Sequence, residues 1–202
     1  MNSKTAEILV VYYSRTGNVA RMARQVCRGI ESVAGATARL RSVPPVSAEN
    51  ERPDKATPDE GAPWASQEDL GACDGLVLGS PTRYGNMAAG MKYFIDSTGA
   101  LWAQGKLADK PAGAFTSTQS MHGGQETTLI SMMLPLLHHG MVYVGLPYTL
   151  PELSTTRSGG TPYGASHVVS AVPEGELSAE ETTLCLALGK RVAQMALKLK
   201  HG

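Results

Sequence analysis

Residues 14–19 have the composition of a phosphate-binding turn. They follow an apolar run at 8–13 and precede an amphipathic pattern, so a buried strand ends here and a helix begins. Hydroxyl oxygens and unpaired backbone N–H groups at such a junction can bind one anion. No lysine lies in the segment, which excludes a Walker A loop and favours a phosphate monoester over a triphosphate. The candidate ligands are Ser14, Arg15, Thr16, Gly17, Asn18 and Val19.

Two further loops carry side chains suited to binding a ring system. The loop at 81–86 combines a flat aromatic, a cation and a glycine, and the loop at 117–124 is polar and glycine-rich. Both follow apolar runs that predict strands. The candidates in these loops are Pro81, Thr82, Arg83, Tyr84, Gly85, Asn86, Ser117, Thr118, Gln119 and Gly123.

The elements that must position these loops alternate between strands and helices. Apolar residues recur at helical spacing in 19–33, in 87–95, in 127–137 and in a last helix after residue 178. Strands are predicted at 8–13, 36–43, 76–80 and 112–116, with a fifth that begins at 141–144. The charged, proline-rich run 44–63 reads as an exposed connection, and 145–172 as an inserted excursion.

Several element ends have sequence signals of their own. Ser178 and Glu181 have the spacing of a capping box that opens the last helix. Asn86 is a plausible N-cap for the helix that follows it, and Pro135 disturbs the end of the helix at 127–137. The alternative reading of 14–19 is an ordinary turn in which Thr16 or Asn18 caps a helix. The apolar stripe of the last helix comprises Leu184, Leu188, Val192, Met195 and Leu199.

This order of elements predicts an α/β fold of flavodoxin type. It is a doubly wound five-stranded parallel sheet with helices on both faces and an insertion near the fifth strand. Ligands of such sheets lie outside the carboxyl ends of the strands, which is where the three loops occur. No GxGxxG fingerprint is present, so a tightly held NAD in a Rossmann site is not indicated.

Length and charge narrow the class of protein. With 202 residues and 42% hydrophobic content, the chain suits a single domain over residues 1–202 better than two small ones. Eighteen basic and eighteen acidic side chains cancel, which gives no electrostatic footprint for nucleic acid or an anionic membrane. We therefore expect a small or neutral partner.

The terminus and the cysteines indicate a cytoplasmic protein. The first residues lack a signal-peptide pattern, and no apolar run approaches the length of a membrane span. Cys27, Cys73 and Cys185 are odd in number, far apart and outside any CxxC pattern. We expect reduced core thiols and no metal site.

Six short stretches resemble a known enzyme family. They are YYS at 12–14, SPTRYGNM at 80–87, GALW at 99–102, GGQE at 123–126, HHGM at 138–141 and GGTPYG at 159–164. Together they span nearly the whole chain, and three of them are far more specific than the phosphate turn. The chain resembles the WrbA-type NAD(P)H:quinone oxidoreductases, which are FMN enzymes of the flavodoxin-like fold.

The resemblance implies a cofactor site and an assembly. FMN would be held by residues 14–19, by 82–84, by the loop that starts at Ser117 and by His138, while Trp102 would lie on the substrate side. His138 would orient the flavin or donate a proton to the quinone, and Arg83 would stabilise negative charge on reduced FMN or on a phosphate. Family members form homotetramers whose active sites are lined by more than one subunit.

The sequence departs from the family pattern at two places, and several of the assigned residues could also have simpler roles. Many relatives have an aromatic residue at Thr16 that is implicated in NAD(P)H contact. The third loop here is one residue longer, with Met121 and His122 where the family usually has Thr and Gly. Arg83 could equally be a solvated loop cation, and Trp102 a cap on the core. His138 has a simpler role open to it as well, because histidine suits a helix C-terminus.

Three classes of function follow. The leading one is FMN-dependent two-electron reduction of quinones by NAD(P)H in a ping-pong cycle, in which NAD(P)H gives a hydride and leaves before the quinone binds. The alternatives are a single-electron carrier of flavodoxin type and a flavin-binding regulatory module without turnover. Net neutrality counts against a carrier, since such carriers tend to be strongly acidic.

Overall fold

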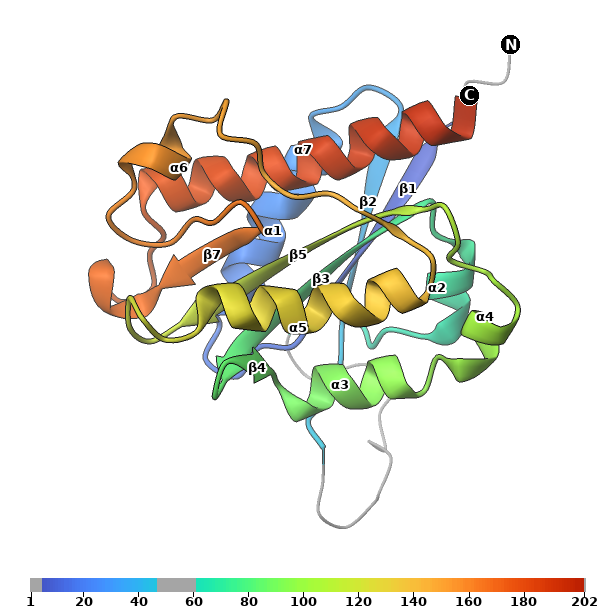
Figure 1. Cartoon of the computed structure of the whole chain (residues 1–202), viewed down its shortest axis with the longest axis horizontal. Helices are drawn as coiled ribbons and strands as arrows, with labels where there is room; N and C mark the ends of the chain where they lie inside the picture. The colour runs from blue at the N-terminus through green and yellow to red at the C-terminus, as the bar shows by residue number, and fades with distance from the viewer. Residues whose placement is uncertain (1–4, 47–60, 202) are drawn as a thin grey trace.

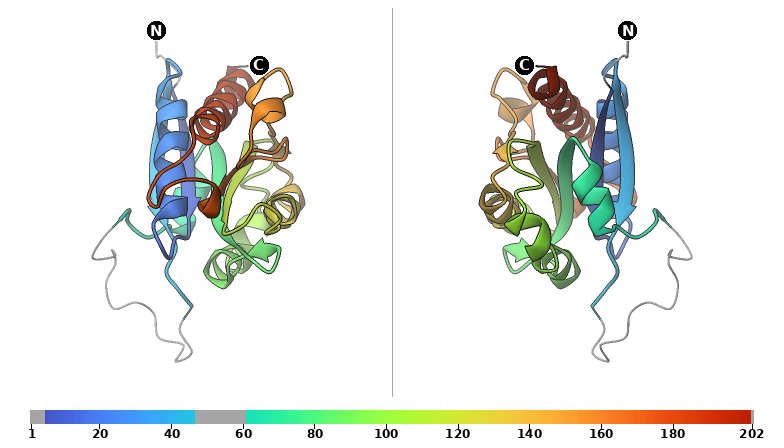
Figure 2. Two further views of the ribbon diagram at one scale, coloured as in Figure 1. Left: turned by 90° about the vertical axis from the view of Figure 1, so that its left-hand side faces the viewer. Right: turned by 90° about the vertical axis from the view of Figure 1, so that its right-hand side faces the viewer.

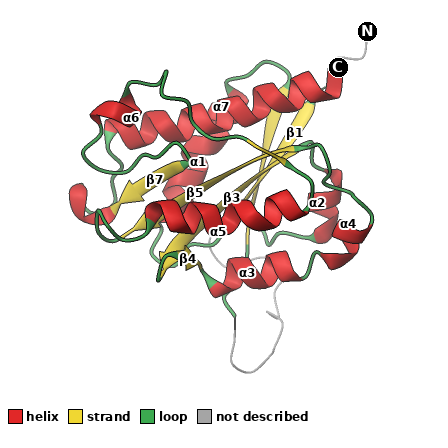
Figure 3. Cartoon of the chain, viewed as in Figure 1, coloured by secondary structure: helices red, strands yellow, loops and turns green. Residues whose placement is uncertain are grey.

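The computed structural model describes residues 5–46 and 61–201 and contains a twisted, mainly parallel sheet between two layers of helices (Figures 1 and 3). The strand order is β2-β1-β3-β5-β6, so the chain leaves β1 toward one edge and later crosses to the other. This confirms the predicted doubly wound fold. The bounds are β1 Ala6–Tyr12, β2 Ala36–Ser42, β3 Gly75–Arg83, β5 Pro111–Thr118 and β6 Val142–Tyr143.

The edge of the sheet beside β5 is shared by two strands. β6 pairs with the start of β5 at Pro111 and Ala112, and β7 (Ala165–Val168) pairs in parallel with Phe115–Thr118 at its end. The insertion between them contains the short helix α6 (Glu152–Thr155). The predicted excursion at 145–172 is therefore corrected, because it includes the strand that completes this edge. The four residues of β7 are too few, among Gly, Pro and Thr neighbours, for periodicity to reveal them.

The two helical layers cover opposite faces of the sheet (Figure 2). One layer consists of α1 (Asn18–Glu31) and α7 (Ala179–His201). The other contains α2 (Gln67–Ala72), α3 (Ala89–Asp96), α4 (Gly99–Ala103) and α5 (Gln125–His138). Two small elements complete the described chain, β4 (Asn86–Met87) and the 3-10 turn η1 (Val169–Ala171).

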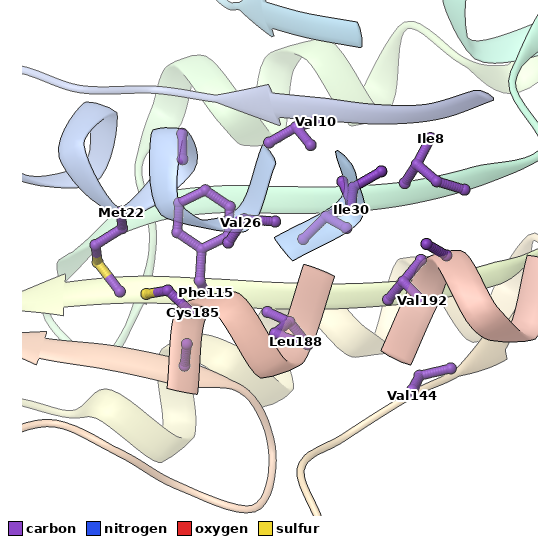
Figure 4. Packing of buried hydrophobic residues seen from close by; sticks show 14 of the residues in the cluster. Ile8, Val10, Met22, Val26, Ile30, Phe115, Val144, Cys185, Leu188 and Val192 are labelled. Atoms are coloured by element: carbon purple, nitrogen blue, oxygen red, sulfur yellow. The ribbon is translucent and has the colours of Figure 1, made fainter. Parts of the chain in front are cut away.

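Side-chain alternation along β1 divides the core into two clusters. Ile8 and Val10 pack with α1 and α7, whereas Leu9 and Val11 pack with the opposite layer. Figure 4 shows the first cluster, in which Phe115 lies among residues of α1 and α7. Burial on both faces explains why the strand sequences are continuous apolar runs.

Several predicted element ends differ from the structure. Asn86 is not the cap of α3, which begins at Ala89; its Oδ1 accepts from the N–H of Met87, 2.9 Å away, within β4. Pro135 lies inside α5, which nevertheless continues to His138. Leu199 of the predicted apolar stripe is 47% exposed, because α7 extends beyond the sheet. Most of the predicted connection at 44–63 lies outside the described residues.

The three cysteines are free. Burial raises the pKa of the Cys27 thiol to about 12 and that of Cys73 to about 11, and it raises the pKa of Cys185 further still. None of the three is therefore a reactive thiolate at neutral pH.

In the part of the chain that the structure describes, no helix has both the length and the apolar character needed to cross a bilayer. The same residues contain no cluster of three potential metal ligands.

Candidate functional site

A cavity of about 440 Å³ lies at the carboxyl ends of β1, β3 and β5. All three predicted loops contribute to it, together with η1. Its lining consists of Ser14, Arg15, Thr16, Asn18, Val19, Pro81, Thr82, Arg83, Ser117, Thr118, Gln119 and Val169. Val169 was missed because it follows the unrecognised strand β7. Most of the sequence-predicted residues of the three loops thus meet at one place, as the polarity of a parallel sheet requires. Those that do not line the cavity are Gly17, Tyr84, Gly85, Asn86 and Gly123.

The turn at 14–18 leaves backbone donors free at the start of α1. Gly17 precedes the helix with a φ of +86°, in the left-handed region, and no side chain caps the helix. Neither Thr16 nor Asn18 is therefore the N-cap. Among the described residues, the N–H groups of Asn18 and Val19 have no hydrogen-bond partner, while that of Ala20 donates to Ser14 Oγ over 3.4 Å. Such a helix start attracts an anion.

The loop predicted at 81–86 is mostly strand. β3 continues to Arg83 and pairs with β4, so Tyr84 and Gly85 alone form the turn, with φ values of +53° and +77°. Two positive φ values are the signature of a type I′ turn, which suits tight hairpins. The ring of Tyr84 is fully exposed at its tip. A short hairpin therefore presents this aromatic ring next to the cavity.

Hydrogen bonds tie this hairpin to the third loop. The Gly85 N–H donates to Thr82 Oγ1 (3.2 Å), and Thr82 Oγ1 lies 2.9 Å from Thr128 Oγ1. Thr128 also donates to the carbonyl of Gly124 (2.7 Å), so its single hydroxyl proton is used there and Thr82 must donate to Thr128. A Cβ at Gly124 would lie 2.8 Å from the Cα of Gly85. The two loops are held together closely.

The third loop is closed by its own contacts. Thr118 Oγ1 donates to the carbonyl of Ser120 over 2.9 Å, and the N–H of Gly123 donates to the same carbonyl over 3.0 Å. Gln125 Nε2 donates to the carbonyl of Met121 over 2.8 Å. The side chains of Met121 and His122 remain exposed. The loop is thus preorganised with polar backbone beside the cavity.

Two cations border the cavity without an acidic partner among the described residues. Arg15 and Arg83 are exposed, and Arg83 Nη1 donates only to the carbonyl of Thr82, over 2.7 Å. Unneutralised positive charge beside free N–H groups favours an anionic ligand.

The structure does not bring His138 and Trp102 to this cavity. Trp102 Nε1 donates to the backbone carbonyl of His138 over 2.8 Å, and both side chains are exposed. His138 ends α5, shortly before Val142 pairs with Pro111 at the start of β5. The cavity lies at the other end of this eight-residue strand, roughly 23 Å away at 3.3 Å per residue. Within one chain, His138 and Trp102 are therefore distant from the cavity, and their roles at the cofactor stay a prediction that needs a second copy of the chain.

The family of the chain follows from comparison with known proteins. Residues 8–152 match the family model of the NADPH-dependent FMN reductases. The chain belongs to this family. A relative from Chromohalobacter salexigens, named NAD(P)H dehydrogenase (quinone), is 45% identical over 96% of this chain and 98% of its own length. One of the same name from Syntrophobacter fumaroxidans is 44% identical over the same shares.

Solved structures agree on the fold. A WrbA-like flavodoxin from Agrobacterium tumefaciens superposes with a TM-score of 0.67 at 25% identity, covering 96% of this chain and 99% of its own. Flavodoxin 2 from Bacillus cereus gives 0.59 at 18% identity over 96% and 99%, which supports the fold alone. The flavodoxin-like prediction is confirmed.

A buried, hydrogen-bonded carboxylate lies beyond the residues that match the FMN reductase model. Glu181 accepts from the N–H groups of Gly159 (2.9 Å), Val168 (3.0 Å) and Ser178 (2.9 Å), and its Oε2 lies 2.8 Å from His167 Nδ1. Burial alone would raise the pKa of Glu181, but these hydrogen bonds outweigh burial and lower it. The capping-box pattern identified Ser178 and Glu181 correctly, whereas His167 had no signal because β7 was not recognised.

Proposed function

We propose that this protein is an FMN-dependent NAD(P)H:quinone oxidoreductase that reduces quinones by two electrons in a ping-pong cycle. The observation that carries this proposal is the meeting of three loops with the predicted chemistry at one cavity of a flavodoxin-like sheet. Membership of the FMN reductase family and two relatives named NAD(P)H dehydrogenase (quinone) support it.

The donor set of the cavity fits FMN. Free N–H groups at the start of α1 and the hydroxyls of Ser14 and Thr16 suit a phosphate monoester. Thr82 and Ser117, from the second and third loops, supply hydroxyls farther along the same cavity. When bound, FMN supplies the capacity to accept a hydride from a nicotinamide and to pass it to a quinone. The residues of the protein itself bind and position the cofactor and the substrates.

The side chains around the cavity then have defined tasks. Residues 14–19 hold the phosphate, with Arg15 adding positive charge. Tyr84 forms a wall at the hairpin tip, and Arg83 stabilises negative charge beside it. Gly85 and Asn86 in the hairpin, and Gln119 and Gly123 in the third loop, shape the edge of the site beside the ring system. The N–H groups of Gly85 and Gly123 are themselves held by Thr82 Oγ1 and by the Ser120 carbonyl.

We place His138 and Trp102 at the active site of a second copy of the chain, in a homotetramer. Their distance from the cavity of their own chain requires another copy if they act on flavin or quinone. Apolar side chains on the same helical layer, Tyr93 (68% exposed), Trp102 (58%) and Leu134 (52%), offer a surface for that contact. In such a site Trp102 would bound the substrate space, and His138 would orient it or donate a proton to the quinone oxygen.

We further treat residues 1–202 as one domain and locate the enzyme in the cytoplasm. Three unpaired cysteines support that compartment.

The direct test combines binding and turnover. Calorimetry of the flavin-free protein should show stoichiometric FMN binding, and NADH should bleach the bound flavin until benzoquinone restores its colour. Initial rates against both substrates should give parallel double-reciprocal lines. Absence of FMN binding would refute the proposal, and intersecting lines with a ternary complex would refute its ping-pong order. Light scattering tests the tetramer, which a fully active stable monomer would exclude.

A further inference from the structure

A second cavity adjoins the phosphate end of the first. It measures about 400 Å³, and Thr16, Asn18, Gln119 and Val169 line both cavities. Its remaining walls come from Arg21 of α1, His167 of β7 and the loop at 172–175 that leads to α7. The loop passes beside the first half of α1 (Figure 2, left). The cavity therefore begins where the phosphate turn ends.

His167 is the buried polar group of this second cavity. The residue is 1% exposed, and its Nδ1 must donate to Glu181, because an ionised carboxylate only accepts. Among the described residues, Nε2 makes no hydrogen bond, and it is the ring nitrogen left for the cavity. Nε2 is not sealed from solvent, so a ligand in the cavity can replace water as its hydrogen-bond partner. Nε2 can accept from a hydroxyl, or bind a proton and donate to an anion.

Arginines continue from this cavity along α1. Arg21, Arg24 and Arg28 occupy one face of the helix and border a third cavity of about 600 Å³, which shares Arg21 and Gly175 with the second. Arg21 and Arg28 are seven residues apart, which spans about 10 Å at 1.5 Å per residue. Leu177 gives the third cavity an apolar wall, and Gln25 and Thr182 add hydrogen-bonding groups.

We propose that this groove, the second and third cavities together, binds the outer phosphate and the adenosine of a flavin dinucleotide, so that the protein accepts FAD as well as FMN. The inference rests on the proposed FMN site, because the phosphate at residues 14–19 is the point from which the dinucleotide continues. Arg21 and His167 would bind the outer phosphate, and the adenosine would lie along Arg24 and Arg28.

The charges and the position of the groove favour this ligand. Glu174 and Glu176 also border the cavities, so their charge offsets part of that of the three arginines. What remains suits the single charge of the outer phosphate of a pyrophosphate, with a neutral base beside it, better than a polyanion. The nicotinamide substrate must approach the flavin ring, whereas the groove leads away from Tyr84 and past the phosphate turn. A tail joined to the flavin phosphate is therefore the ligand that reaches it.

The test measures FMN and FAD affinities of the flavin-free protein by quenching of flavin fluorescence. In the unmodified protein, FAD should bind within about tenfold of FMN. Gln25→Trp places an indole in the third cavity, away from residues 14–19, and should weaken FAD by about tenfold or more while leaving FMN unchanged. His167→Leu should reduce the FAD affinity relative to FMN by a similar factor, because it removes a hydrogen bond to a charged group.

A matched control separates blockage of the groove from the general effect of a surface indole. Gln194→Trp adds the same side chain at an exposed position of α7 outside these cavities and should change neither affinity. Tight FMN binding with FAD weaker by about 100-fold or more would overturn the groove and leave the proposed function intact. Equal loss of both flavins in Gln25→Trp would also overturn it. Failure of the unmodified protein to bind either flavin would refute both proposals.

Discussion

The two ends of the sheet differ in what they expose. At the carboxyl end, tight turns at Gly17 and at Tyr84–Gly85 hold polar groups around a cavity. At the amino end, Trp102 and His138 lie on an open surface, joined by one hydrogen bond. Both ends contain motifs of the same resemblance, yet a strand of about 23 Å separates them. If both motifs act on one flavin, as proposed, they must come from different copies of the chain.

The two ends of the sheet also differ in the burial of the carboxylate that holds neighbouring segments of the chain together. Glu181, near the cavity, is fully buried and accepts four hydrogen bonds. Asp74, at the start of β3, accepts from the N–H of Glu7 (2.9 Å) and from Lys200 Nζ (2.7 Å) with its side chain 24% exposed. Burial makes the first anchor strong and costly to disturb, whereas water can replace the second.

The largest expected effect is that of Glu181→Gln. In glutamine, an NH₂ group replaces one of the two carboxylate oxygens. This group must face either the N–H groups of Gly159 and Val168 or the Ser178 N–H and the His167 ring. At least one of these donors then loses its acceptor. We expect a loss of about 3 kcal/mol in the free energy of unfolding, measured with urea at pH 7. Glu31→Gln, exposed on α1, is the control and should change little. A Glu181→Gln variant as stable as the control would contradict the anchoring role.

The lowered pKa of Glu181 predicts that the stability of the protein depends on pH. The folded-state pKa of Glu181 is lowered from its ordinary value of 4.5, so its contribution is complete above that value and is lost as the pH falls through the folded pKa. The difference in stability between the unmodified protein and Glu181→Gln should be constant from pH 7 to about 5 and shrink below about 4. A difference that persists undiminished to pH 3 would show that ionisation of Glu181 is not its source.

Subunit complementation tests whether the two ends belong to different sites. Ser14→Asp sets a carboxylate against the phosphate, and His138→Ala removes the imidazole; each alone should leave about 1% of the activity. Co-expression of the two variants should restore activity. In a mixed assembly, some sites combine the unmodified Ser14 of one chain with the unmodified His138 of another and so contain neither substitution. Co-expressed His138→Ala and Trp102→Ala should not recover, since both changes fall at the same end. No recovery in the first pair would contradict the shared site.

A smaller effect is expected at Asp74, the partly exposed anchor. Asp74→Asn removes the charge partner of Lys200 but keeps an oxygen for the Glu7 N–H, so unfolding should become easier by about 1 kcal/mol. The measurement is the same urea titration. A loss as large as that of Glu181→Gln would remove the contrast between buried and exposed anchors.

The smallest effect is that of Arg83→Gln. The guanidinium is exposed and has no acidic partner among the described residues, so water screens its attraction to a bound anion. FMN affinity should fall by about threefold at low salt, and the difference should disappear at high ionic strength. Arg157→Gln, an exposed arginine outside the cavity, should have no effect. An effect of Arg83→Gln that salt does not alter would indicate a direct structural role instead.

Much of this molecule could be predicted from local patterns. The apolar run at 8–13 and the helical spacing after it predicted β1 and α1, because both faces of a central strand and one face of its helix are buried. Strand polarity then predicted that the loops at 14–18, 81–86 and 117–124 would meet, and residues from all three line the cavity. The capping-box spacing predicted the contacts between Ser178 and Glu181.

The tertiary structure decided what depends on contacts between distant segments. β7 forms only because β5 offers hydrogen bonds to four residues that have no strand pattern of their own, and with it come Val169 in the cavity and His167 against Glu181. The placement of His138 and Trp102 could not be predicted either. α5 runs antiparallel to the strands and ends with His138 at the opposite end of the sheet, where Trp102 of α4 donates to its carbonyl. Neighbours in the sequence determine local structure such as a turn or a helix cap. The packing of the whole chain determines which distant residues a side chain contacts.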